Sequence, residues 1–187
     1  MLFVSLCELC ASAVKGGILM LDKSVRGNII VLRPKPLQVN SMPNSDGKIA
    51  LLIAEDNQGD RTLLEKAFLE SGIQNRLFFA EDGQELINYM NEAIVYSDMV
   101  KSSYLVLLDL QMPRLNGFDT LKILKKDVRF KKIPVVILTS SALEEDVAKT
   151  YEMGANSFFK KPADYKEFLD LAKLIKKYWL QKSVLPG

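Results

Sequence analysis

Residues 105–117 read LVLLDLQMPRLNG, an apolar run that ends abruptly at Asp109 and continues into a loop. The run from Tyr104 to Leu108 has the length of a β-strand and is apolar on both faces. Strands of a parallel sheet have this character, because helices cover such a sheet on each side. The segment therefore predicts a buried parallel strand with a carboxylate at its carboxyl end.

Four other short apolar runs have the length of a strand and are bounded by turn residues: Ile49–Ala54, Leu77–Ala80, Val135–Leu138 and Ser157–Phe159. Of these, LLIA (51–54) and VVIL (135–138) are also apolar on both faces. The segments between and after the five runs carry apolar residues at helical spacing. Strand and helix thus alternate, which is typical of an α/β fold with a doubly wound, five-stranded parallel sheet and right-handed crossovers. The expected buried helix faces are Leu63, Leu64, Ala67 and Phe68; Leu86, Ile87 and Met90; Phe118, Leu121, Ile123 and Leu124; Val147, Ala148 and Tyr151; and Phe168 to Trp179.

Polar residues are absent from the strand bodies and follow the strands where they end. Glu55, Asp56, Asp109, Thr139 and Lys161 all occupy such positions. In a doubly wound sheet, ligands bind at the carboxyl ends of the strands, near the point where the strand order reverses. We therefore expect three carboxylates, one hydroxyl and one ammonium to surround a single crevice.

The expected crevice suits phosphoryl transfer onto a carboxylate. Three crowded acids repel one another, and a hard divalent cation such as Mg²⁺ keeps them ionised. The chain lacks the glycine-rich Walker loop that binds nucleotide phosphates. The remaining hypothesis makes Asp109 the nucleophile, with Lys161 paired to the phosphoryl group.

The composition excludes several other classes of protein. The sequence has no histidine, so it can build neither a Ser-His-Asp triad nor a phosphohistidine of its own. A net charge of +2 does not indicate a nucleic-acid partner. No stretch reaches the roughly 20 apolar residues of a membrane span. A length of 187 residues suits one domain with an extension.

Residues 1–46 are expected to be an irregular extension or linker, and residues 47–187 the domain. The start resembles a signal peptide, but it lacks basic residues and contains Glu8, which disfavours secretion. Residues 28–32 could form a short strand without an obvious partner. An alternative interpretation of this segment is that translation begins at Met42, so that residues 1–41 are not part of the native protein. Cys7 and Cys10 form an isolated pair, either incidental or with a redox or metal role, and this cysteine usage favours a reducing, cytoplasmic location.

Taken together, the motifs resemble the receiver domains of two-component response regulators (CheY-like) over about residues 48–180. The segments that carry the resemblance are LLIAEDN (51–57), LVLLDLQMPRLNG (105–117), VVILTSSA (135–142) and FFKKP (158–162). The resemblance implies a flavodoxin-like sheet with strand order 2-1-3-4-5. It also implies a phosphorelay protein with Asp109 phosphorylated to 4-aspartylphosphate.

The same resemblance assigns roles to the other residues. Asp56 would bind Mg²⁺ directly and Glu55 through water, with the backbone carbonyl of Gln111 as a further ligand. Thr139 and Lys161 would bind the phosphoryl group, Thr139 and Phe158 would act as switch residues, and Pro162 would follow a cis peptide bond. Two features depart from the commonest pattern: the acidic pair is Glu-Asp rather than Asp-Asp, and the switch aromatic Phe158 has no ring hydroxyl.

A subgroup is also suggested by two segments. The long polar stretch 91–103 and the ending KKYWLQKSVLP (176–186) resemble single-domain regulators associated with bacterial phytochromes. The partner would be a sensor histidine kinase, either a phytochrome or a hybrid kinase, and the signal would pass to a downstream protein or through a homodimer. We expect neither an enzyme nor a membrane protein. Two alternatives remain: an aspartyl-phosphate phosphohydrolase, which Gln111 disfavours, and a receiver-fold interaction module that acts without phosphorylation.

Overall fold

The computed structural model describes residues 22–26, 29–33, 49–95 and 103–186. The chain divides into two units, residues 1–36 and 37–187. In the first unit, β1 (Asp22–Arg26) and β2 (Ile29–Arg33) form an antiparallel pair. The sequence predicted a strand at 28–32 but not its partner. The two cysteines, Met42 and the stretch 34–48 lie outside the described residues.

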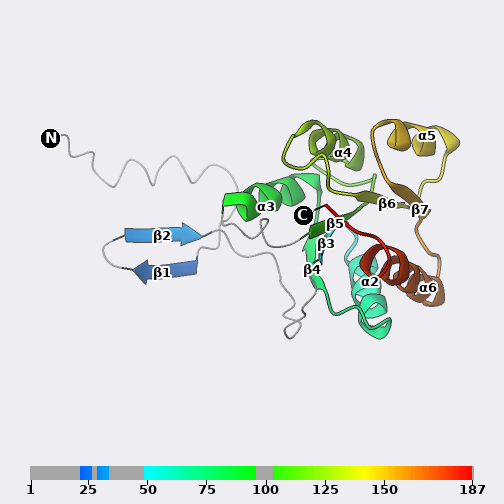
Figure 1. Ribbon diagram of the computed structural model, residues 1–187, viewed down its shortest axis with the longest axis horizontal. Helices are drawn as coiled ribbons and strands as arrows, with labels where there is room; N and C mark the ends of the chain where they lie inside the picture. Colours follow the sequence, from blue (N-terminus) through cyan, green and yellow to red (C-terminus); the bar gives the residue numbers. More distant parts are fainter. Residues whose placement is uncertain (1–21, 27–28, 34–48, 96–102, 187) are drawn as a thin grey trace. The chain divides into compact units, whose positions relative to one another are not determined.

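The second unit is built on a five-stranded parallel sheet (Figure 1). Its strands are β3 (Ile49–Ala54), β4 (Arg76–Ala80), β5 (Ser103–Leu108), β6 (Val135–Thr139) and β7 (Ser157–Lys160). They lie in the order β4-β3-β5-β6-β7, with β5 at the centre. Counted from β3, this is the order 2-1-3-4-5, so the predicted fold is confirmed.

Helices cover both faces of this sheet. They are α2 (Gln58–Glu70), α3 (Gly83–Val95), α4 (Gly117–Lys126), α5 (Glu144–Glu152) and α6 (Tyr165–Ile175), which continues into the π-helix η3 (Lys176–Leu180). Helices α2 and α6 lie on one face, and α3, α4 and α5 on the other (Figure 1). Among the described residues, no helix has both the length and the apolar character that a bilayer crossing requires.

Each face of the sheet has its own hydrophobic core. Leu105 and Leu107 of β5 pack toward α2 and α6, in the same core as Phe68 of α2 and Trp179 of η3. The neighbouring residues Val106 and Leu108 point to the opposite core, with α3 and α4. This alternation along one strand follows from the pleat of a β-sheet. Strand β5 is therefore buried on both sides, as its uninterrupted apolar sequence predicted.

Two predicted helix faces need correction. In α5, Ala148 and Tyr151 are exposed and Thr150 is the buried residue, with its hydroxyl donating to the carbonyl of Val147. This nine-residue helix precedes the edge strand β7, which is itself only partly buried, so it covers little core. In α4, Ile123 is also exposed. After α6, Trp179 is buried, whereas Tyr178 is 56% exposed.

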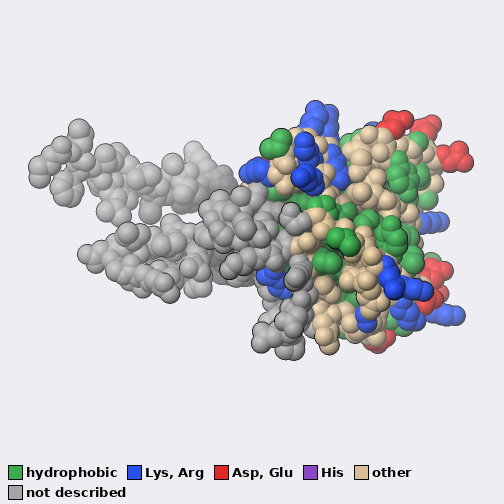
Figure 2. Space-filling model, in the orientation of Figure 1, with side chains coloured by type: hydrophobic (Ala, Val, Ile, Leu, Met, Phe, Trp, Pro, Cys, Tyr) green, Lys and Arg blue, Asp and Glu red, His purple; other side chains and the backbone are tan. Residues whose placement is uncertain are grey.

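Charged side chains of both signs occur on the surface of the second unit. Figure 2 shows basic side chains gathered over α4 and acidic side chains over α5. The acidic group corresponds to Glu144, Glu145 and Asp146 in the first turn of α5, where negative charge complements the helix dipole.

Candidate functional site at the carboxyl edge of the sheet

The turn between β3 and α2 carries the acidic pair. Asn57 caps α2, its side-chain oxygen accepting a hydrogen bond from the Asp60 N–H at 3.1 Å. Arg61 donates to the backbone carbonyls of Glu55 (2.7 Å) and Asp56 (2.9 Å), which fixes the turn from the opposite side. The backbone on both sides of the two carboxylates is therefore held before any ligand binds.

Asp109 lies at the end of the central strand β5. Its N–H donates to the carbonyl of Ala54 on β3 at 3.0 Å, and its Oδ1 accepts from the Gln111 N–H at 3.1 Å. A hydrogen bond of 3.0 Å from the Gly117 N–H to the carbonyl of Leu110 closes the loop that follows Asp109. A Cβ at position 117 would overlap the carbonyl oxygen of Asp109, so this close approach requires glycine.

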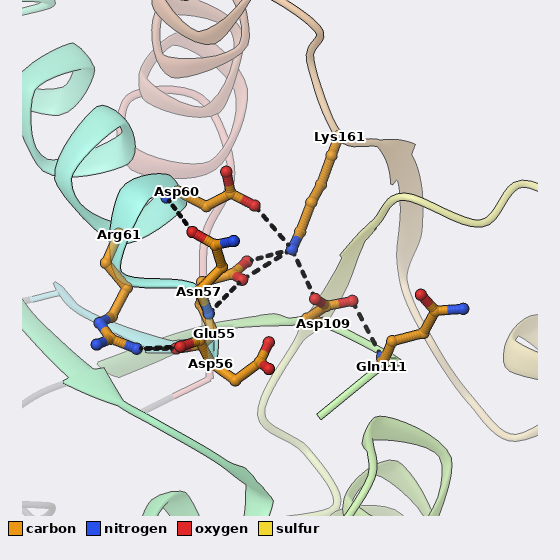
Figure 3. A network of polar contacts seen from close by, with 8 residues as sticks. All are labelled: Glu55, Asp56, Asn57, Asp60, Arg61, Asp109, Gln111 and Lys161. Atoms are coloured by element: carbon orange, nitrogen blue, oxygen red, sulfur yellow. Dashed lines mark hydrogen bonds and ion pairs between the residues drawn. The ribbon is translucent and has the colours of Figure 1, made fainter. Parts of the chain in front are cut away.

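Lys161 reaches the acids from the end of β7. Its N–H donates to the carbonyl of Thr139 at 2.8 Å, which holds β7 beside β6. Its ammonium lies 2.6 Å from Asp109 Oδ2, 2.7 Å from Glu55 Oε2 and 3.1 Å from Asp60 Oδ2 (Figure 3). One cation thus pairs with carboxylates from three separate segments of the chain.

Burial makes this network electrostatically strong. The side chains of Lys161, Glu55 and Asp109 are 8%, 1% and 4% exposed. Burial raises the pKa of Glu55 to about 7, although the hydrogen bond and charge of Lys161 limit the rise. Burial alone would lower the pKa of Lys161, but the hydrogen bonds to Asp109 and Glu55 outweigh it, and the pKa is raised. The lysine is therefore held as a cation.

Three of the carboxylates can hold a metal ion. One oxygen each from Glu55, Asp56 and Asp109 lies within 4.8 Å of the other two. Asp56 is exposed, while the other two are buried, so the group opens to solvent on one side. Carboxylate oxygens in such a half-open group are the ligands that Mg²⁺ uses when it also retains water.

Thr139 borders the same edge, whereas Phe158 lies two residues before the end of β7. The Thr139 hydroxyl is buried and has no hydrogen-bond partner among the described residues. Phe158 is partly buried and packs against the core that contains α3 and α4. The peptide bond before Pro162 is trans, because no cis bond occurs among the described residues, so the predicted cis bond is wrong. The two isomers of a bond before proline differ by only about 0.5–1 kcal/mol, and the lysine reaches the acids from the trans form.

Two features of the site were not predicted from the sequence. Asp60 joins the network from the first turn of α2; its sequence position alone suggested only a helix-starting acid. The loop after β5 is also fastened to α3, because Arg114 pairs with the buried carboxylate of Asp82, and the Gly83 N–H donates to the carbonyl of Leu115 at 3.1 Å. A charge in a loop after a strand is too common to have revealed this pairing.

A family profile described as the response regulator receiver domain matches residues 51–173. The chain belongs to this family. Receiver domains are signalling domains that histidine kinases phosphorylate, and they are not enzymes in their own right. The match includes the whole edge of the sheet from Glu55 to Lys161.

Proteins similar to this chain over most of its length include regulators of different processes. The chain is 30% identical to the response regulator Rcp1 of Synechocystis, covering 73% of this chain and 92% of that protein. It is 31% identical to a probable methanogenesis regulatory protein, FilR2, of Methanothrix harundinacea, covering 73% and 87%. The crystal structure of the phosphorylated cyanobacterial phytochrome response regulator RcpA superimposes with a TM-score of 0.67 at 30% identity, covering 74% and 98%. The predicted similarity to phytochrome-associated receivers is confirmed.

Proposed function

We propose that this receiver domain accepts a phosphoryl group on Asp109 from the phosphohistidine of a sensor histidine kinase. The observation that carries the proposal is the Lys161 ammonium, held 2.6 Å from one carboxylate oxygen of Asp109. A cation in this position stabilises negative charge that arrives on the acceptor. The buried, unpartnered Thr139 hydroxyl supports the same assignment, since it can donate to a phosphoryl oxygen.

In the transfer step, an Asp109 carboxylate oxygen attacks phosphorus and forms a P–O bond. The P–N bond to the kinase histidine breaks, and the imidazole nitrogen keeps the electron pair. The product is an acyl phosphate that carries about two negative charges. Lys161 holds the phosphoryl oxygens in line during this exchange, and the packed core around β5 fixes the direction of attack.

The acids fit a divalent cation, for which we propose Mg²⁺. Glu55, Asp56 and Asp109 supply three oxygens close to one another, and the backbone carbonyl of Gln111 would be the fourth protein ligand. When bound, the ion neutralises charge on the transferring phosphoryl group. The raised pKa of Glu55 supports the assignment, because a buried carboxylate in this position gains from a nearby cation.

Phosphorylation would then change the surface shown to protein partners. Thr139 and Lys161 would move toward the phosphoryl group, which biases an existing equilibrium of the elements that follow them, α5, β7 and α6. Large exposed apolar side chains on and beside these helices offer contact area: Leu143, Tyr151, Leu174 and Tyr178. The switch role of Phe158, the downstream target, homodimer formation and a cytoplasmic location stay predictions.

The similarity to Rcp1 and RcpA supports a kinase of the phytochrome class as the partner. Incubation with acetyl phosphate and Mg²⁺, followed by mass spectrometry of the intact protein, tests the acceptor directly. We expect the mass of one phosphoryl group on the wild-type chain and no addition to Asp109→Asn. If the wild-type chain gains no mass with either acetyl phosphate or a phosphorylated kinase, it acts as an interaction module without phosphorylation.

A further inference from the structure

Asp60 differs from the other two carboxylates that contact Lys161. It lies 3.1 Å from the ammonium, farther than Glu55 or Asp109, and its side chain is 27% exposed. Its carboxylate is outside the group of three that can share a metal ion. Figure 3 shows it reaching the ammonium from the α2 side, away from Asp109. Asp60 is thus free to pair with Lys161 whether or not the other acids bind a cation.

The position of Lys161 does not depend on Asp60. Two buried carboxylates hold the ammonium at shorter distances, and the backbone N–H of Lys161 is bonded to Thr139. A longer, partly exposed ion pair adds little to such an arrangement. The main effect of Asp60 is therefore its charge, which lies within about 6 Å of the accepting Asp109 oxygen because one nitrogen contacts both.

From this geometry we infer that Asp60 competes with the incoming phosphoryl group for Lys161 and slows phosphorylation of Asp109. The inference rests on the proposed function of the site. Asp60 adds the negative charge of one more carboxylate to those of Glu55, Asp56 and Asp109 at this edge of the sheet. Every phosphoryl donor is itself an anion, so each of these charges opposes its entry.

The reaction with acetyl phosphate isolates this effect from kinase docking. An Asp109 oxygen attacks phosphorus, the P–O bond to acetyl breaks, and acetate leaves with the electron pair. Asp60 forms no bond in this step. Its carboxylate makes one of the ion-pair contacts of the Lys161 ammonium, and the phosphoryl oxygens must displace this contact. Removing the charge of Asp60 should therefore speed the step without changing its chemistry.

The experiment measures kcat/KM for phosphorylation of the full chain by acetyl phosphate at saturating Mg²⁺. Asp60→Asn should raise this constant about three- to tenfold, and the gain should shrink as salt screens the partly exposed charge. Asp60→Glu keeps the charge and should remain near the wild-type rate. Glu145→Gln, which neutralises a first-turn acid of α5, is the matched control and should also leave the rate unchanged.

A second donor separates a charge effect from a structural one. Phosphoramidate carries less negative charge than acetyl phosphate, so the increase in kcat/KM that Asp60→Asn produces should be smaller with this donor. The inference is overturned if Asp60→Asn, folded by circular dichroism, reacts no faster than the wild type, or if Asp60→Glu shows the same gain. Equal gains for the two donors also overturn it. A wild-type chain that accepts no phosphoryl group from either of these donors or from a phosphorylated kinase overturns the proposed function instead.

Discussion

Replacement of Lys161 by methionine tests how much the ion network contributes to stability. Methionine keeps an unbranched chain but removes the ammonium, so the buried carboxylates of Glu55 and Asp109 lose their countercharge. Removal of one partner from a buried ion pair costs about 3–5 kcal/mol, because the remaining charge stays buried. We expect a loss near the lower end, about 3 kcal/mol at about pH 8 without metal, because Glu55 can bind a proton when the ammonium is absent.

The same reasoning predicts how the loss depends on pH. Burial already raises the pKa of Glu55 to about 7, and removal of Lys161 raises it further. At about pH 5.5, Glu55 of the variant is protonated and neutral, so the loss should fall to about 1 kcal/mol. Lys161 of the wild type is charged at both pH values in the folded and unfolded chain, since its pKa in the folded chain is raised. The difference between the two pH values therefore reports the carboxylates.

Urea denaturation followed by circular dichroism at both pH values is the assay. Lys160→Met is the control: Lys160 is the exposed neighbour on β7, and its replacement should change the free energy of unfolding by less than about 0.5 kcal/mol. A Lys161→Met protein as stable as the wild type at about pH 8 would refute the reasoning. So would a loss that is equal at the two pH values, because protonation of Glu55 would then have no part in it.

Three further predictions follow from the same structure. In the metal-free protein, Glu55 keeps its proton up to about pH 7 in the folded chain, whereas it loses the proton at its ordinary pKa of 4.5 in the unfolded chain. As the pH rises from about 4.5 to 7, this residue should therefore lower the free energy of unfolding by about 3 kcal/mol in all. Urea denaturation across this range should show the slope in the wild type and not in Glu55→Gln. A Cβ in Gly117→Ala would overlap the carbonyl oxygen of Asp109, so the variant should lose about 2–3 kcal/mol and accept phosphoryl groups more slowly; an unchanged urea midpoint would contradict the tight packing. Trp179→Ala should cost about 3–4 kcal/mol, because this side chain is buried, whereas the exposed Tyr178→Ala should cost under about 1 kcal/mol; thermal melts showing equal losses would count against the observed orientation of the last helix.

Much of the fold could be predicted because the strand sequences leave few alternatives. The five apolar runs lie within one residue of the observed strands at each end, since short apolar runs bounded by turn residues are typical of strands. The runs that are apolar on both faces also predicted a sheet covered on both sides. The location of the site could be predicted from the same assignment of strands. Parallel strands bring their carboxyl ends to one edge, so Glu55, Asp109 and Lys161 had to lie near one another.

The remaining features depend on contacts that no local pattern encodes. The face of α5 was wrong because that helix lies toward the sheet edge, where Tyr151 has little core to cover and Thr150 bonds to its own helix. Asp60 was missed because an acid in the first turn of a helix has an ordinary explanation in the helix dipole. The isomer at Pro162 was wrong because the energy difference between isomers is small enough for tertiary structure to decide it.

The central place of β5 has a mechanical consequence. Successive residues of this strand belong to opposite hydrophobic cores, and its last residue leads directly into Asp109. Close-packed interiors deform little, so a displacement of Asp109 along the strand axis would strain the α2–α6 layer and the α3–α4 layer together. Substitutions that loosen either layer should therefore alter the same chemical event, even when they lie on faces of the sheet that never touch each other.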